Sequence, residues 1–222
     1  MADTYSVFKI IEYNNHFDNL KNLKKLVNES YIVNKDFFGQ DISPFKIKFV
    51  YTRRDFNKHI GKTSTPDWLV GVVIKRQLII FSPAVFDIVS SHTKSEFKGV
   101  LSHEISHIFK NDIFSFDYPT WLSEGLSGYI SSQYKKIRAF KDVDFRLLHR
   151  KEDWVGNTNY PQAYLFFAYL IKRFGKEKMI KLLKSLRGKE PIVKFETKFK
   201  ELFELSFNKT TKDWRKDISR KQ

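Results

Sequence analysis

The first half of the chain alternates between a helical and a strand-like spacing of apolar residues. A helical spacing near 17–30 predicts an amphipathic helix packed on a sheet, with apolar positions Phe17, Leu20, Leu23, Leu26 and Val27. Residues 45–51 alternate apolar and polar side chains, as a half-buried strand does. Two apolar runs, 69–74 and 77–81, flank a pair of basic residues and together predict a β-hairpin.

The second half of the pattern is helical. A helix is predicted at about 94–110, with Thr93 and Glu96 as a T-x-x-E capping box and Asn111 as a stop. Its buried stripe consists of Phe97, Leu101, Ile105 and Ile108. Further helices are expected near 119–136, 161–174 and 176–187, followed by a tail. Strands that come early and helices that come late indicate the α+β fold class.

The predicted helix at 94–110 carries the segment His103-Glu104-Ile105-Ser106-His107, which has the form H-E-x-x-H. Residues four apart lie on one face of a helix, so His103 and His107 can converge on a single ion. Glu104 lies about 100° further round the helix, where it can reach a water in the open position of that ion. The alternative is an accidental spacing of two surface histidines, and the next segment argues against it.

Glu124 is the candidate third ligand, within the segment Trp121-Leu122-Ser123-Glu124-Gly125. Pro119 can occupy the first turn of the predicted helix that holds it. Gly125 and Gly128 are unusual choices, because each costs about 1 kcal/mol against alanine inside a helix. A second helix approaching closely at that face explains both glycines, and such an approach would bring Glu124 to the metal.

Together the two motifs resemble those of the gluzincins, and most closely the compact minigluzincin or "peptidase MA-like" branch. The resemblance covers about residues 45–175. It implies an α+β zincin-like metallopeptidase in which Zn²⁺ is bound by His103, His107 and Glu124, with Glu104 as general base. From the length and composition we expect one domain, 1–222, with two lobes: about 1–115 with the mixed sheet and the H-E-x-x-H helix, and about 116–222 mostly helical. The implied activity is hydrolysis of peptide bonds by a zinc-bound water that Glu104 activates.

A third block, residues 160–170, resembles the gluzincin helix that begins with a tyrosine stabilising the tetrahedral intermediate. That alignment implies a catalytic role for Tyr160, with Tyr164 as the fallback. A phenol contributes to catalysis only where it reaches the developing oxyanion. The alternative is that Tyr160 only packs at the start of a helix, just before Pro161.

The hairpin bears on the type of peptidase. By the resemblance, one of its arms is the sheet edge that pairs with an extended substrate peptide. The alternative is an ordinary sheet hairpin with no role in binding. Large gluzincin aminopeptidases hold the substrate's free amine with a glutamate near this place, but residues 69–82 contain no acidic side chain. This absence favours an endopeptidase, although Asp67 or Asp87 could contribute an anchor from another loop.

Two features of the site stay open in the sequence. The hydrogen-bond partners of the metal-bound histidines could be a backbone carbonyl, Ser127, Asp112 or Asp117. The tail 209–222 contains Asp213 and Asp217, and minigluzincins are known for terminal segments that occupy the cleft. A latent enzyme is therefore a further expectation, which deletion of the tail would test.

The net positive charge of the chain suggests a hypothesis that competes with the peptidase. The net charge is +15 and the sequence pI is about 9.7, so an acidic partner or nucleic acid is a conceivable ligand of a non-catalytic protein with this fold. The basic residues are scattered over amphipathic helices and form no nucleic-acid motif, which favours a solvated basic face and a peptide or protein substrate.

Composition bounds the compartment only loosely. The chain has no cysteine, so no disulfide framework and no thiol ligand exist. No apolar run has the length of a signal peptide or of a membrane span, so we expect no transmembrane segment and a cytoplasmic location. A leader that has already been removed is the alternative.

Overall fold

The computed structural model describes residues 7–137, 143–154 and 158–219 of the chain. The chain divides into two compact units, Met1–Asp112 and Ile113–Gln222, and each unit is described by itself below. Mixed helix and strand content confirms the α+β class. The single domain with two lobes stays a prediction. No helix in the described part of the chain is long and apolar enough to cross a membrane.

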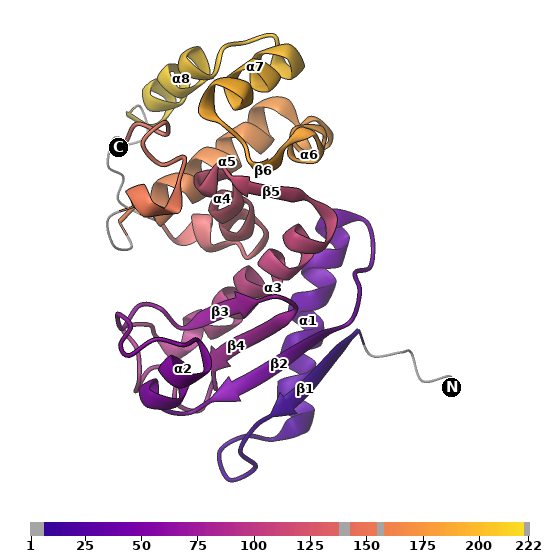
Figure 1. The fold of residues 1–222 in the computed structure, drawn as a ribbon, viewed down its shortest axis with the longest axis vertical. Helices are drawn as coiled ribbons and strands as arrows, with labels where there is room; N and C mark the ends of the chain where they lie inside the picture. Colours follow the sequence, from indigo (N-terminus) through magenta and orange to yellow (C-terminus); the bar gives the residue numbers. More distant parts are fainter. Residues whose placement is uncertain (1–6, 138–142, 155–157, 220–222) are drawn as a thin grey trace. The chain divides into compact units, whose positions relative to one another are not determined.

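The first unit is built on a four-stranded mixed sheet of order β1-β2-β4-β3 (Figure 1). Its strands are β1 (Phe8–Glu12), β2 (Phe45–Val50), β3 (Gly71–Ile74) and β4 (Gln77–Phe81). β2 runs parallel to both β1 and β4, whereas β3 pairs antiparallel with β4, with Gly71 opposite Ile80. The predicted hairpin is therefore confirmed, and its first arm, β3, is an edge of the sheet.

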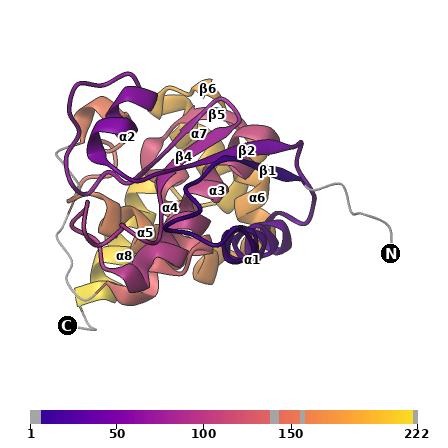
Figure 2. The same ribbon diagram turned by 90° about the horizontal axis from the view of Figure 1, so that it is seen from below.

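Helices α1 (Leu20–Phe38) and α3 (Phe97–Ile113) lie on the same face of this sheet (Figures 1 and 2). The amide of Asn34 on α1 donates to the carbonyl of Ser102 on α3 at 3.1 Å. Rings from both helices also meet, because the Tyr31 and Phe109 centroids lie 5.1 Å apart. Since Ser102 directly precedes the H-E-x-x-H segment, α1 and the sheet fix the position of the candidate ligands on α3.

The predicted bounds of the first helix were wrong at both ends. α1 begins at Leu20 because the Asn19 side chain accepts hydrogen bonds from the backbone N–H groups of Lys21 and Asn22. It runs on to Gly39, whose φ of 73° ends the helix in the left-handed region. Phe17 therefore lies outside the helix, and 59% of it is exposed.

The helix around the H-E-x-x-H segment begins as predicted and ends later. The Thr93 backbone N–H donates to the Glu96 carboxylate at 2.7 Å, ahead of the short 3₁₀ turn η1 (Lys94–Glu96) that leads into α3. Asn111 does not stop α3. Asp112, one residue later, accepts hydrogen bonds from the backbone N–H of Ser43, at 3.0 Å, and from the Arg76 guanidinium.

Arg53 anchors the loop that leads into β3. This residue begins α2 (Arg53–His59), a helix that the sequence pattern did not predict. Its guanidinium donates to the carbonyls of Leu69 and Val89 at 2.6 Å each and to that of Asp67 at 3.0 Å. Burial lowers the pKa of Arg53, but carbonyl oxygens on several sides compensate for the lost hydration.

The second unit is mostly helical. Its elements are β5 (Ser115–Tyr118), α4 (Thr120–Ile130), η2 (Gln133–Lys136), η3 (Lys151–Asp153), α5 (Tyr160–Phe174), α6 (Lys176–Ser185), β6 (Arg187–Lys189), α7 (Ile192–Phe203) and α8 (Phe207–Ser219). β5 and β6 pair in parallel, which the sequence pattern did not predict. The helix expected near 161–174 is confirmed as α5.

Two predicted helix ends in this unit were wrong. The helix expected at 119–136 ends at Ile130, because Ser132 has a φ of 60° and a separate 3₁₀ turn follows. Pro119 is the N-cap of α4 and does not lie within its first turn. The helix expected at 176–187 ends at Ser185, since Leu186 is extended and leads into β6.

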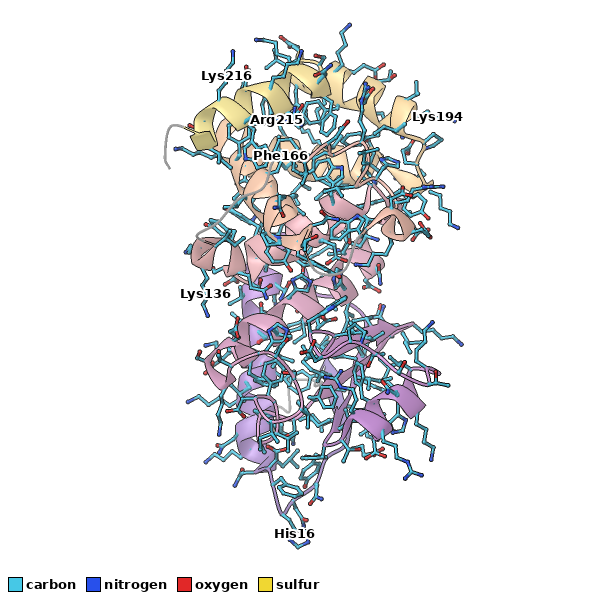
Figure 3. The ribbon with its side chains drawn as sticks, turned by 90° about the vertical axis from the view of Figure 1, so that its left-hand side faces the viewer. His16, Lys136, Phe166, Lys194, Arg215 and Lys216 are labelled. Atoms are coloured by element: carbon cyan, nitrogen blue, oxygen red, sulfur yellow. The ribbon has the colours of Figure 1, made fainter. Side chains whose placement is uncertain are left out.

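An aromatic core joins the helices of the second unit. The Trp214 ring centroid on α8 lies 5.2 Å from that of Phe145 and 5.1 Å from that of Phe166. Figure 3 shows Phe166 among the packed side chains, whereas Lys194 and Lys216 point outward. The tail predicted to restrain the enzyme is therefore largely the core helix α8, and the Asp213 carboxylate within it pairs with Arg173 at 3.0 Å.

Candidate metal centre

His103 and His107 converge on α3 as the spacing predicts. Their Nε2 atoms lie 3.1 Å apart, and the rings are steeply inclined, with an interplanar angle of 76°. Two ring nitrogens bound to one tetrahedral zinc at about 2.0–2.1 Å would lie roughly 3.3–3.4 Å apart. The pair therefore needs to open by only a few tenths of an ångström to share such an ion.

The burial of the two histidines is more typical of metal ligands than of residues on a solvated surface. His103 is 6% exposed, and His107 is half-buried. The Nε2 atoms are within hydrogen-bond distance of each other, so one ring can donate its Nε2–H to the other, or both can turn their lone pairs toward a shared cation. Two imidazoles at this spacing are common ligands of zinc, copper, iron and nickel.

Glu104 lies against the edge strand β3 through Gly71. A Cβ built on Gly71 would lie 2.7 Å from the Glu104 Cγ and 2.9 Å from its Cδ, closer than real side chains approach. Only glycine leaves room for the carboxylate there, so the packing places the candidate base against one face of β3, which is an edge strand. Gly71 was not predicted as a site residue from the sequence, although an isolated glycine at a strand often marks such a close approach.

Glu124 lies on α4, a helix whose two glycines are explained by α5. A Cβ on Gly125 would lie 2.6 Å from the Ala163 carbonyl oxygen, and one on Gly128 would lie 2.2 Å from the Tyr164 ring. The expected close approach of a second helix is thus confirmed. The approaching helix is α5 and not the helix of the histidines, so the glycines do not by themselves bring Glu124 to a metal.

The loop before η3 positions the start of α4. The carbonyl of His149 accepts from the Thr120 N–H at 2.7 Å, and that of Leu148 accepts from the Trp121 N–H at 3.4 Å. These carbonyls satisfy donors that a helix N-terminus otherwise leaves unpaired. The Trp154 indole N–H donates to the same Leu148 carbonyl at 3.1 Å, which links the residues before and after η3.

Lys151 on η3 contacts two of the predicted site residues. Its Nζ lies 3.9 Å from Oε1 of Glu124 and donates a hydrogen bond to the hydroxyl of Tyr160. It also lies over the rings of Trp154 and Tyr160, at 4.6 and 4.4 Å from their centroids. Lys151 belongs to no motif and is one of 40 Lys and Arg residues, so no signal in the sequence could have singled it out.

The two candidate tyrosines differ in surroundings. Tyr160 is the first residue of α5, with Pro161 behind it in the first turn, and it is half-buried. Tyr164 is 9% exposed, and its ring fills the space left by the missing side chain of Gly128. Tyr164 is therefore explained by helix packing. Tyr160 remains the better candidate for the catalytic tyrosine.

The carboxylates proposed as partners of the histidines are mostly engaged or exposed. Asp112 accepts hydrogen bonds from Ser43 and Arg76, and Asp117 is an exposed residue of β5. Ser127 is fully buried on α4. Asp112 is therefore disfavoured as a partner, while Ser127 and backbone carbonyls stay open.

Comparison with family models and with curated proteins finds no match for this chain. The resemblance to gluzincins therefore rests on the motif residues alone.

Proposed function

We propose that the protein is a zinc-dependent peptidase in which His103, His107 and Glu124 hold the ion. The convergence of the two Nε2 atoms at 3.1 Å, next to a carboxylate on the same helix, carries this proposal. Glu124 is the proposed third ligand, so that each of the three residues would offer one ligand atom to the ion. Two imidazoles and one carboxylate are a donor set of catalytic zinc sites, which keep the fourth position open.

The proposed mechanism combines the zinc ion with two side chains, Glu104 and Tyr160. A zinc ion held by these residues would lower the pKa of a coordinated water to about 7 and polarise the scissile carbonyl. Glu104 accepts the proton of the attacking water and then delivers it to the departing amine. The Tyr160 hydroxyl donates to the oxyanion that develops on the substrate, and loss of such a donor typically costs about 10²-fold in rate.

The edge strand β3 is the proposed binding site of the substrate backbone. β3 is an outer strand of the sheet, so its outer edge offers main-chain donors and acceptors to an extended peptide. Gly71 on this strand packs against Glu104, which supports a base that acts close to a peptide bound along β3. Because residues 69–82 contain no acidic side chain to hold a free amine, we propose endopeptidase activity.

The proposed fold family is the zincin family, in its minigluzincin branch. A mixed sheet with an antiparallel edge strand, a helix bearing H-E-x-x-H and a helical second unit support this assignment. The competing function, binding of an acidic partner through a basic surface, draws support only from the charge. Several basic side chains pair with carboxylates within the second unit, as Arg146 does with Glu196 at 2.7 Å.

Peptide hydrolysis tests this function directly. Zinc-loaded wild-type protein would be incubated with a peptide library, and the products would be identified by mass spectrometry. Glu104→Gln is the matched control, because it keeps the size of the side chain and removes its basicity. We expect internal cleavage by the wild type and none by the variant at equal zinc content. Equal cleavage by both proteins would remove Glu104 from the mechanism, and no cleavage by either would refute the peptidase proposal.

A further inference from the structure

The contacts of Lys151 add a function that no motif assigns. Its ammonium donates to the Tyr160 hydroxyl and lies 3.9 Å from Oε1 of Glu124. These two partners are the proposed oxyanion donor and the proposed third zinc ligand. All of these residues belong to the second unit, so the contacts are set by the packing of one compact body.

The direction of the hydrogen bond follows from the chemistry of the two groups. A lysine ammonium has three donors and no acceptor, so the Tyr160 oxygen must be the acceptor. The phenol proton then has to point away from Lys151, toward some other acceptor. A phenol that accepts from a cation also becomes a stronger donor, because linked hydrogen bonds polarise one another.

Several contacts hold the ammonium in place. Its Nζ lies over both the Trp154 and the Tyr160 rings, at 4.6 and 4.4 Å, which is within the range of cation–π attraction. The indole N–H of Trp154 is already bound to the Leu148 carbonyl at 3.1 Å, so it is not available to replace Lys151 as the donor to Tyr160. Nearly half of the lysine side chain, 47%, is nevertheless exposed, so a substitution there creates no cavity in the core.

We infer that Lys151 is a positioning residue that directs the Tyr160 hydroxyl proton toward the substrate oxyanion. This inference rests on the proposed peptidase function. Lys151 itself touches no reacting atom and acts through Tyr160. The interaction contributes only when negative charge develops on the substrate oxygen, so its loss lowers kcat and leaves KM unchanged.

A double-mutant cycle measures whether Lys151 acts through Tyr160. Wild type, Lys151→Met, Tyr160→Phe and the double variant would be assayed, zinc-loaded, on one peptide that the wild type cleaves. We expect kcat to fall about 10-fold in Lys151→Met, the size of one charge-assisted hydrogen bond, and about 100-fold in Tyr160→Phe. The double variant should match Tyr160→Phe alone, because the lysine has no hydroxyl left to orient.

Two further variants separate positioning from a general effect of charge. Lys189→Met is the matched control, since its Nζ also lies over a tyrosine ring, at 5.9 Å from the Tyr118 centroid, and we expect it to keep the wild-type kcat. Lys151→Arg keeps a cationic donor and should recover most of the rate lost in Lys151→Met. If kcat fell as far in Lys151→Arg as in Lys151→Met, the hydrogen bond donated to Tyr160 would not be the cause of the loss.

The possible results separate this inference from the proposed function. If the wild type cleaves peptides and the two single losses multiply in the double variant, Lys151 does not act through Tyr160 and the inference is wrong. Reduced zinc content in Lys151→Met would also contradict it, because the lysine would then act on Glu124. If zinc-loaded wild type cleaves no peptide, the proposed function fails and the inference fails with it.

Discussion

Gly71→Ala is the most informative change in the first unit. The new Cβ would lie 2.7 Å from the Glu104 Cγ, 2.9 Å from its Cδ and 3.1 Å from its Oε1. Carbon atoms in contact prefer about 3.5–4.0 Å, so the Glu104 carboxylate has to move by roughly 1 Å. The atoms that clash belong to the outer part of a flexible side chain, so this movement requires little change of the backbone.

The expected result is a large loss of activity with a small loss of stability. We expect a destabilisation of about 1 kcal/mol, at the low end for an overpacked site. A displacement of about 1 Å at a catalytic group can cost about 10²-fold in rate, so kcat/KM should fall by that order. Zinc binding should persist, because the substitution does not touch His103 or His107.

The assay compares kcat/KM, zinc content and thermal unfolding of Gly71→Ala with those of Gly39→Ala. Gly39 has a φ of 73° and no heavy atom within 4 Å of a built Cβ, so its substitution strains the backbone without moving Glu104. This control should lose stability and keep its activity. A folded, zinc-loaded Gly71→Ala protein with wild-type kcat/KM would refute the placement of Glu104 beside β3.

Further predictions concern the second unit. Gly125→Ala places a Cβ 2.6 Å from the backbone oxygen of Ala163, which cannot move alone, so we expect about 1–3 kcal/mol of destabilisation in urea unfolding. Burial lowers the pKa of His149 below its ordinary 6.5, so the unfolded chain takes up a proton that the folded protein refuses. Stability should therefore fall as the pH falls below about 6.5, and urea midpoints should show a weaker fall in His149→Gln. Deleting 209–222 removes the buried ring of Trp214 and should destabilise the protein by at least about 3 kcal/mol, which would mask any release of latency. Asp213→Asn is the better test of self-restraint, and an unchanged rate in a folded variant would argue against it.

The elements that were predicted from the sequence are those fixed by residues close to them in the chain. The α3 stripe and the capping pair Thr93 and Glu96 are set by neighbours within a few residues, and the hairpin is marked by its two apolar arms. The convergence of His103 and His107 is a property of a single helix turn. These features follow from helix and strand geometry without knowledge of the rest of the fold.

Features that depend on distant partners were missed. β1 is largely exposed and forms only because it pairs with β2, and the short strands β5 and β6 pair across about seventy residues of sequence, Ser115 with Arg187. The glycines of α4 predicted a close helix but could not identify it as α5. Lys151 was missed because its role arises from packing against Tyr160 and Trp154, and one lysine among many carries no pattern.

Metal content is the measurement that tests the proposed zinc site of His103, His107 and Glu124. Untagged protein purified without chelator would be analysed by inductively coupled plasma mass spectrometry, beside His103→Ala, Glu124→Ala and Glu104→Gln. We expect about one zinc per wild-type chain, the same in Glu104→Gln, and a clear loss in both ligand variants. Wild-type protein that holds no zinc after reconstitution, or full zinc in Glu124→Ala, would contradict the proposed site.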